Sequence, residues 1–365
     1  MIVKNETKTL PILFKSLYDV IDYYVIMDTG STDGTPELIK EEMEKYNIKG
    51  EVHHMEWVNF AVCRQKSLEL TIGKADYVLI IDADEELKYN NKSFLNLLTK
   101  DCYYLKRKYD NNEYYLPAII NIKFNNELKW KWEGVVHNYL VSENKNILEE
   151  KIEDNVYILS HVHGGAKSHG VTNKEKYLRD AKMLEEELKK NPNDTRSQFY
   201  LAQSYRDAGM LEKSMEEYKK RLSMGGWFEE VFYSQYQIGK LMIKLNYKFN
   251  EFFDVFLKAY EIDSRRIEAI YYIINMCRIQ KKYHLGYILG KGIYNIRNIN
   301  ADLFVDKWVY DYALLDEFSI CAYWVGDYKS SLECTKILLS ENKIPEYYIE
   351  RIKDNMKFSQ KKLKN

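Results

Sequence analysis

The 365-residue sequence lacks the features that mark secreted and membrane-spanning proteins. It has only five cysteines, and no two of them have the close spacing of a metal site. They lie mostly within apolar or helical patterns, which indicates reduced thiols and not a disulfide framework. No apolar run approaches the length needed to cross a bilayer, and the first residues do not resemble a signal peptide. We therefore expect a cytoplasmic protein with reduced thiols and no transmembrane segment.

An excess of charge of one sign is also missing. The chain has 54 basic and 55 acidic residues, which gives a formal net charge of −1. A balanced charge provides no general attraction to nucleic acid or to an anionic membrane surface. We expect neither of them as a partner.

The length favours two domains, and the periodicity of apolar residues changes near Gly164 and Gly165. Up to about residue 165, short apolar runs alternate with helical patterns. This alternation predicts an α/β domain with a mostly parallel, Rossmann-like sheet that helices cover on both faces. We expect strands at 23–28, 52–57 and 76–82, and helices at 7–22, from 35 onward and at 61–70.

From about residue 173 to the end, helical periodicity is almost continuous. The segments 197–218 and 320–332 match the tetratricopeptide (TPR) pattern of paired helices, with Gly209 and Gly326 at the tight turns. Such helix pairs cannot bury their apolar faces alone and must stack as a solenoid. The sequence therefore predicts an α/β domain over residues 1–168 and an all-α, TPR-like solenoid over residues 169–365.

Two acidic loops in the first half follow apolar, strand-like runs. The first loop covers residues 28–35, and the second covers residues 82–85, Asp-Ala-Asp-Glu. We expect both at the carboxyl ends of strands, which is the edge where open α/β sheets bind ligands. Two aspartates one residue apart suit a divalent cation that carries a diphosphate, because hard cations bind through few carboxylates plus substrate phosphates. A solvated turn is the alternative interpretation of an isolated Asp-x-Asp.

The residues suggest a division of roles within this site. We predict that Asp84 binds the metal and that Asp82 faces the ribose or the water shell of the metal. Asp28 would accept a hydrogen bond from a base or a ribose, and Glu6 could serve the same pocket. Arg64 could reach a base or a phosphate, although a plain surface cation is the alternative.

Together these residues resemble the family 2 glycosyltransferases of the nucleotide-sugar-dependent GT-A fold. The helical half is similar to the repeat domain attached to one branch of that family. The resemblance rests on residues 2–6, 28–35, 60 with 64, 82–85, 132–137 and 161–165.

The resemblance implies a donor site for a UDP- or GDP-sugar. Glu6, Asp28 and Arg64 would hold the nucleoside. Asp82 and Asp84 would bind Mn²⁺ or Mg²⁺ together with the diphosphate. We also assign Asp33 to this site, and it can cap the helix that follows.

A histidine after the last strand of this fold often completes the metal site. His161 is our first candidate and His163 the second. Residues one apart on a strand point to opposite faces, so we expect only one of the two to bind. The alternative for either is a packing histidine or one on the acceptor side.

By the same resemblance, the reaction is an inverting transfer of a hexose-type sugar to a glycan, protein or peptide acceptor. A general base must take the acceptor's proton, and the candidates are His137 and Glu133. Asn138 stands where the family commonly has glutamate. We expect the helical half to recognise the acceptor or to form a homodimer.

Three other functions remain open. A sugar nucleotidyltransferase would share the architecture, but it needs a glycine-rich N-terminal loop, and residues 4–7 contain no glycine. A non-catalytic TPR scaffold with a vestigial GT-A domain would not bind a metal-nucleotide complex. A hydrolase built on the same aspartates would release free sugar without an acceptor.

Overall fold

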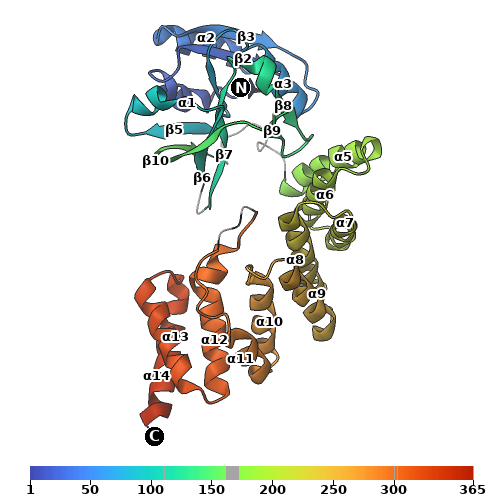
Figure 1. Ribbon diagram of the computed structural model, residues 1–365, viewed down its shortest axis with the longest axis vertical. Helices are drawn as coiled ribbons and strands as arrows, with labels where there is room; N and C mark the ends of the chain where they lie inside the picture. The colour runs from blue at the N-terminus through green and yellow to red at the C-terminus, as the bar shows by residue number, and fades with distance from the viewer. Residues whose placement is uncertain (110–111, 162–171, 300, 302, 365) are drawn as a thin grey trace. The chain divides into compact units, whose positions relative to one another are not determined.

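The computed structural model describes residues 1–109, 112–161, 172–299, 301 and 303–364. It divides the chain into two compact units, Met1–Lys190 and Asn191–Asn365 (Figure 1). The first unit thus includes helix α5 (Asn173–Lys190), which the sequence-based boundary at residue 168 assigned to the helical domain. That boundary stays a prediction.

The first unit begins with a parallel sheet of three strands. Strands β1 (Ile2–Val3), β2 (Tyr23–Asp28) and β3 (Lys49–His54) pair in the order β1-β2-β3. The connecting helices are α1 (Leu10–Leu17) and α2 (Thr35–Lys45), and α3 (Phe60–Glu69) follows β3. Helix α1 forms where apolar residues recur at helical spacing, and Leu10, Leu13, Phe14 and Leu17 are all buried. This region confirms the predicted α/β fold.

A mixed sheet of five strands follows, in the order β4-β7-β6-β10-β5. Only β6 and β10 pair in parallel, and the other neighbours are antiparallel. The parallel arrangement expected from the sequence is therefore confined to the first three strands and to this one pair. The strands are β4 (Tyr77–Leu79), β5 (Glu85–Tyr89), β6 (Cys102–Tyr109), β7 (Asn112–Asn121) and β10 (Glu149–Ser160).

Smaller elements complete the first unit. A hairpin-like pair of antiparallel strands, β8 (Trp130–Glu133) and β9 (Tyr139–Ser142), packs beside α3. A 3-10 helix covers Lys92–Leu97, and a short helix α4 covers Asn125–Leu128. One hydrophobic core connects the parallel and the mixed sheet, because Ile26 of β2, Leu87 of β5 and Ile158 of β10 belong to the same buried cluster.

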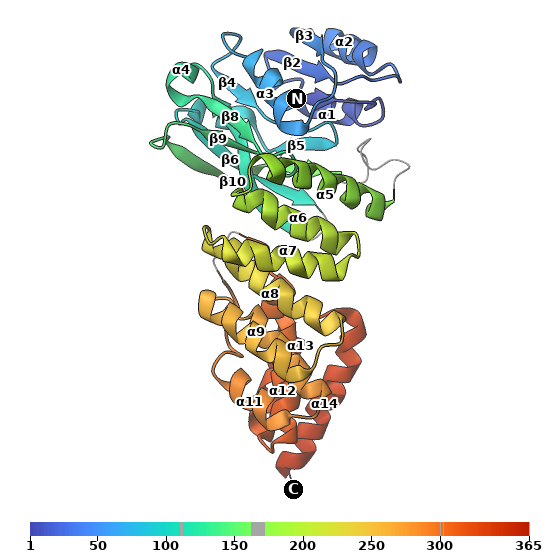
Figure 2. The same ribbon diagram turned by 90° about the vertical axis from the view of Figure 1, so that its right-hand side faces the viewer.

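The second unit is helical (Figure 2), with a π-helical turn (Val309–Ala313) before α12. Gly209 and Gly326 occupy the tight turns between paired helices, at φ +79° and +90°. These findings confirm the predicted all-helical, repeat-like region. The helices are α6 (Thr195–Asp207), α7 (Leu211–Ser223), α8 (Phe228–Lys244), α9 (Phe249–Ile262), α10 (Glu268–Ile279), α11 (Tyr283–Lys291), α12 (Leu314–Trp324), α13 (Tyr328–Glu341) and α14 (Glu346–Lys364).

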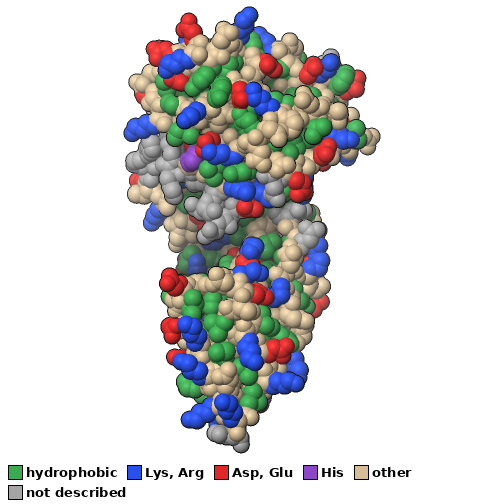
Figure 3. Space-filling view, turned by 90° about the vertical axis from the view of Figure 1, so that its left-hand side faces the viewer, with side chains coloured by type: hydrophobic (Ala, Val, Ile, Leu, Met, Phe, Trp, Pro, Cys, Tyr) green, Lys and Arg blue, Asp and Glu red, His purple; other side chains and the backbone are tan. Residues whose placement is uncertain are grey.

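The surface and the thiols agree with the composition. Acidic and basic side chains are interspersed over the face shown in Figure 3. All five cysteines are buried and none forms a disulfide. Within the described part of the chain, no helix combines the length and the apolar character that a membrane span requires.

Candidate functional site

The first acidic loop is organised around Asp28 at the end of β2. Its carboxylate accepts hydrogen bonds from the backbone amides of Gly30 (3.1 Å) and Ser31 (3.2 Å) and lies 3.3 Å from Nδ1 of His54. The residue is 4% exposed, and this burial alone would raise the pKa of its carboxyl group. The hydrogen bonds from Ser31 and Gly30 outweigh burial, so the pKa is lowered and Asp28 is ionised at neutral pH.

Asp33 connects the loop to the segment that follows β1. One carboxylate oxygen accepts from the amide (3.1 Å) and the hydroxyl (2.6 Å) of Thr35, and the other accepts from the amide (3.2 Å) and hydroxyl (2.9 Å) of Thr7. Asp33 is not the cap residue of α2, because Gly34 occupies that position, but Asp33 accepts a hydrogen bond from the first amide of the helix. Asp33 therefore fixes the spacing between the two segments that carry Glu6 and Asp28.

Glu6 lies at the same edge. Its amide donates to the Thr35 hydroxyl (2.9 Å), and its carboxylate accepts from the Thr9 hydroxyl (2.7 Å). The negative charge of Glu6 is also one of the charges that raise the pKa of Asp84. The structure therefore brings the first and second acidic segments together.

Arg64 and Asp82 form an ion pair. Asn59 caps helix α3 by accepting from the Val62 amide (2.9 Å), and Arg64 follows in the second turn. Its Nη2 donates to both carboxylate oxygens of Asp82, at 2.5 and 2.7 Å. Burial would raise the pKa of Asp82, but the nearby charges of Arg64 and Arg107 lower it below the usual value.

The Arg64 guanidinium also contacts the β8–β9 hairpin. It lies 5.0 Å above the ring of Trp132 in a cation–π arrangement. Its Nη1 lies 3.4 Å from Oδ1 of Asn138. Nδ2 of Asn138 is buried without a hydrogen-bond partner in the described structure, so a polar ligand at this point would satisfy it.

Asp84 is the electrostatically exceptional member of the site. It lies in the turn between β4 and β5, which the Glu85 amide closes by donating to the Asp82 carbonyl (3.2 Å). Burial and the negative charges of Asp82, Glu85 and Glu6 raise the pKa of its carboxyl group to about 6. A cation bound here would relieve the repulsion among these carboxylates.

A buried ion pair holds this turn in place. Arg107 of β6 pairs with Glu85, and both side chains are almost fully buried. Glu85 also accepts from the Asp82 amide (2.8 Å) and the Ser160 hydroxyl (2.9 Å). Sequence analysis missed Arg107, although it shares strand parity with Tyr103 and Leu105, which point into the core.

Only one of the two candidate histidines lies among the described residues. His161 follows β10, and its amide donates to the Asp84 carbonyl (2.8 Å). Its half-exposed side chain lies 3.4 Å from Glu86 and is paired with that residue. His163 lies outside the described residues. Among the residues that the structure describes, no group of three or more His, Cys, Asp and Glu side chains could hold a metal ion by itself.

Both candidate bases lie on the β8–β9 hairpin. Glu133 ends β8, and its carboxylate accepts from the Tyr139 hydroxyl (3.0 Å). His137 is exposed and has a left-handed backbone (φ +50°) in a turn that begins at Gly134 (φ +85°). Trp132 and Asn138 of the same hairpin contact Arg64, so the hairpin places both candidates on the element that borders the acidic site.

Parts of the chain are similar to known glycosyltransferases and to a TPR protein. Residues 1–137 match the family model for glycosyl transferase family 2. Over 235 residues the chain is 25% identical to the SPbeta prophage-derived glycosyltransferase SunS of Bacillus subtilis, which covers 60% of this chain and 53% of the relative. Over 88 residues it is 35% identical to a TPR repeat-containing protein of Synechococcus elongatus, with coverage of 24% and 20%.

The chain thus spans about half of the first relative and about a fifth of the second. Among solved structures, a MamA protein aligns at 15% identity and a TM-score of 0.37 over 47% of this chain and 85% of that one. A TPR protein of Parabacteroides merdae aligns at 14% identity and a TM-score of 0.39, with coverage of 52% and 69%. Residues 1–137 are thus similar to glycosyl transferase family 2, and the rest of the chain includes an all-helical region that resembles TPR proteins.

Proposed function

We propose that this protein is a metal-dependent glycosyltransferase that moves a hexose-type sugar from a nucleotide-diphosphate sugar to an acceptor, with inversion at the anomeric carbon. The observation that supports it most is the position of Asp82 and Asp84 in the turn between β4 and β5, inside the region that matches glycosyl transferase family 2. Burial and the neighbouring carboxylates raise the pKa of Asp84 in this turn. Perturbed carboxylates gathered at the edge of a sheet are typical of functional sites.

The residues fit a divalent cation, Mn²⁺ or Mg²⁺. Asp84 would be its main ligand and Asp82 a second, with the remaining positions filled by phosphate oxygens and water. This division agrees with the lack of three or more metal-ligating side chains in one group among the described residues. The His161 side chain would bind the cation only after its contact with Glu86 is broken. When bound, the cation would stabilise the negative charge of the departing diphosphate.

We assign the nucleotide to the two loops beside the cluster. Glu6 and Asp28 would accept hydrogen bonds from the ribose or base of a UDP- or GDP-sugar, and Asp33 would hold their segments in register. Arg64 would exchange part of its ion pair with Asp82 for a phosphate oxygen, because guanidinium binds both groups in the same planar geometry. The orphaned amide of Asn138 would then be close to a new acceptor.

The acceptor would approach from the β8–β9 hairpin. Either His137 or Glu133 would take the proton of the attacking hydroxyl or amine as it bonds to the anomeric carbon. The helical unit would recognise a glycan, protein or peptide acceptor, or would form a homodimer. A deletion of residues 191–365 that leaves acceptor affinity and oligomeric state unchanged would contradict both roles of the helical unit.

The test compares Asp84→Asn with Asp76→Asn, an exposed aspartate that pairs with Lys123. Thermal midpoints are measured with UDP or GDP, with and without MnCl₂, and the hydrolysis of UDP-, GDP-, CMP- and dTDP-sugars is screened. We expect metal-dependent stabilisation and turnover in wild type and Asp76→Asn, and neither in Asp84→Asn. Full turnover in a folded Asp84→Asn variant would overturn the assignment.

The same screen separates the alternatives when it also includes acceptors and a nucleoside triphosphate with a sugar phosphate. A vestigial domain on a TPR scaffold predicts no metal-dependent stabilisation by any nucleotide. A sugar nucleotidyltransferase predicts diphosphate release from a nucleoside triphosphate and a sugar phosphate. A hydrolase predicts undiminished release of free sugar when acceptors are added.

A further inference from the structure

One short segment of the helical unit is bound by helices that are distant from it in the sequence. Residues 303–306, here called the strap, precede the π-helical turn and α12. The strap contacts α6, α8 and the residues at the start of α10. These are the first helices of three successive helix pairs, α6/α7, α8/α9 and α10/α11.

The helices bind the strap through its main chain. The amide of Leu303 donates to the carboxylate of Glu229 (2.6 Å). The carbonyls of Leu303 and Phe304 accept from Arg266, at 2.6 and 2.9 Å. Glu229 and Arg266 therefore bind backbone groups of the strap, and these contacts do not depend on which side chains the strap carries.

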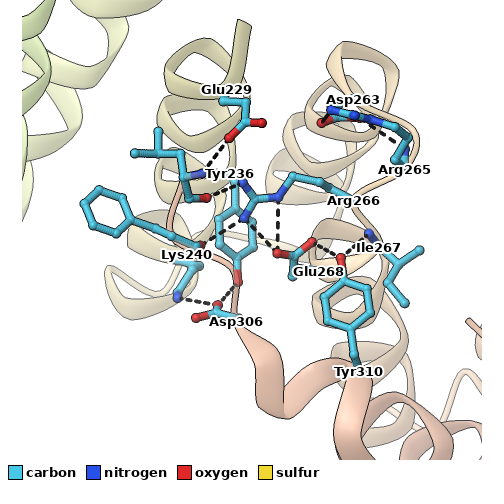
Figure 4. A network of polar contacts seen from close by, with 12 residues as sticks. Glu229, Tyr236, Lys240, Asp263, Arg265, Arg266, Ile267, Glu268, Asp306 and Tyr310 are labelled. Carbon is cyan, nitrogen blue, oxygen red and sulfur yellow. Dashed lines mark hydrogen bonds and ion pairs between the residues drawn. The ribbon is translucent and has the colours of Figure 1, made fainter. Parts of the chain in front are cut away.

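Two side chains of the strap are recognised as well. Phe304 stacks against Phe199 of α6 (6.3 Å between ring centroids) and contacts Tyr233 of α8 (5.1 Å). Asp306 accepts hydrogen bonds from Tyr236 and from Lys240 (3.3 Å) of α8 (Figure 4). The strap thus presents an aromatic residue and, two positions later, an acid.

The residues that bind the strap form one surface, here called the strap-binding face. In α8 they recur at positions 229, 233, 236 and 240, a spacing that places them on one side of a helix. Arg266 at the start of α10 is held in place by Glu268, which also accepts from the Tyr310 hydroxyl (2.6 Å) (Figure 4). Arg266 is therefore held in position by a partner outside the strap.

The strap itself is held in an unfavourable conformation. Phe304 has a left-handed backbone (φ +41°), which a bulky residue rarely adopts. Its side chain stays 45% exposed despite the two ring contacts. Strained residues of this kind persist where the surrounding contacts impose them, and they cluster at ligand clamps and switches.

From these contacts we propose that the strap is an internal ligand, and that the strap-binding face is a site for a short peptide with an aromatic residue followed two positions later by an acid. Such a peptide would take over the hydrogen bonds from Glu229 and Arg266 and the contacts of Phe304 and Asp306, and the strap would leave. This inference concerns binding alone and does not require that the first unit transfers a sugar.

The test uses the full chain and a fluorescein-labelled peptide with the sequence of residues 299–307. The strap is weakened by the double substitution Phe304→Ala with Asp306→Asn, and fluorescence anisotropy measures peptide affinity. We expect at least tenfold tighter binding to the double variant than to wild type. Adding Lys240→Met to the double variant should abolish this gain, and so should replacing the peptide's own phenylalanine and second aspartate by alanine.

Lys307→Ala is the matched control, because Lys307 adjoins the strap but pairs with Asp311 and is exposed; it should bind like wild type. Circular dichroism checks that each variant is folded. A second measurement needs no variant: an excess of unlabelled peptide should accelerate hydrogen exchange of the Leu303 amide in the wild-type protein. No tightening in a folded double variant, or no change in exchange at millimolar peptide, would overturn the proposal.

Discussion

In the first unit, the carboxylates of Asp82, Asp84 and Glu6 gather at a sheet edge, and the pKa of Asp84 rises to about 6. In the helical unit, Arg266 and Glu268 are fully buried, yet each has an ionic partner and further hydrogen bonds. Charge is thus compensated in the second unit and left partly uncompensated in the first. The contrast separates a group held ready for a ligand from groups that complete a folded structure, since a bound cation or a proton would remove the repulsion among the carboxylates of the first unit.

The largest effect should come from breaking the compensated pair. Arg266→Met leaves Glu268 buried without its ionic partner and should lower the free energy of unfolding by about 3–5 kcal/mol. Urea denaturation followed by circular dichroism measures it. Lys258→Met, which removes an exposed pair with Asp254, should change it by less than about 1 kcal/mol. Equal effects of the two substitutions would contradict the compensation in the helical unit.

Removing the uncompensated charge should have the opposite sign. Because folding raises the pKa of Asp84 from its ordinary value of 3.8 to about 6, its ionised form opposes folding, and stability falls as the pH rises through this interval. Asp84→Asn should therefore be more stable than wild type above pH 6, by about 1 kcal/mol after allowance for solvent screening. Below pH 4 the difference should shrink. Thermal midpoints of both proteins across this range measure it, and a variant less stable at pH 7.5 would argue against repulsion at this site.

A smaller effect concerns the helical turns. Gly326 has φ +90° and open space around its Cβ position, so Gly326→Ala should cost only the backbone strain, about 1 kcal/mol. Gly292 also has open space but an ordinary φ of −83°. Gly292→Ala should leave the free energy of unfolding unchanged or raise it slightly, as urea denaturation would measure. An equal decrease for both substitutions would show that backbone conformation is not the cause.

The sequence predicted what local patterns determine. Strand 23–28 and the acidic loop after it were predicted because an apolar run ends abruptly at Asp28, and the structure has β2 at these residues. The mixed pairing of β4 to β10 was not predicted, because strand order depends on contacts between distant segments. The Arg107–Glu85 pair and the bound strap were not predicted either, because both depend on contacts between distant segments. Neither is marked by a periodic pattern in the sequence. Of the candidate site residues, the structure brings Glu6, Arg64, Asp82 and Asp84 together, while their roles stay predictions.

Anomalous scattering at the manganese edge, from crystals grown with MnCl₂ and UDP, tests the central proposal most directly. The account predicts a peak about 2.1 Å from a carboxylate oxygen of Asp84, next to the diphosphate, with Arg64 turned partly from Asp82 toward phosphate. A nucleotide bound without manganese at Asp84, or a peak elsewhere on the molecule, would contradict it.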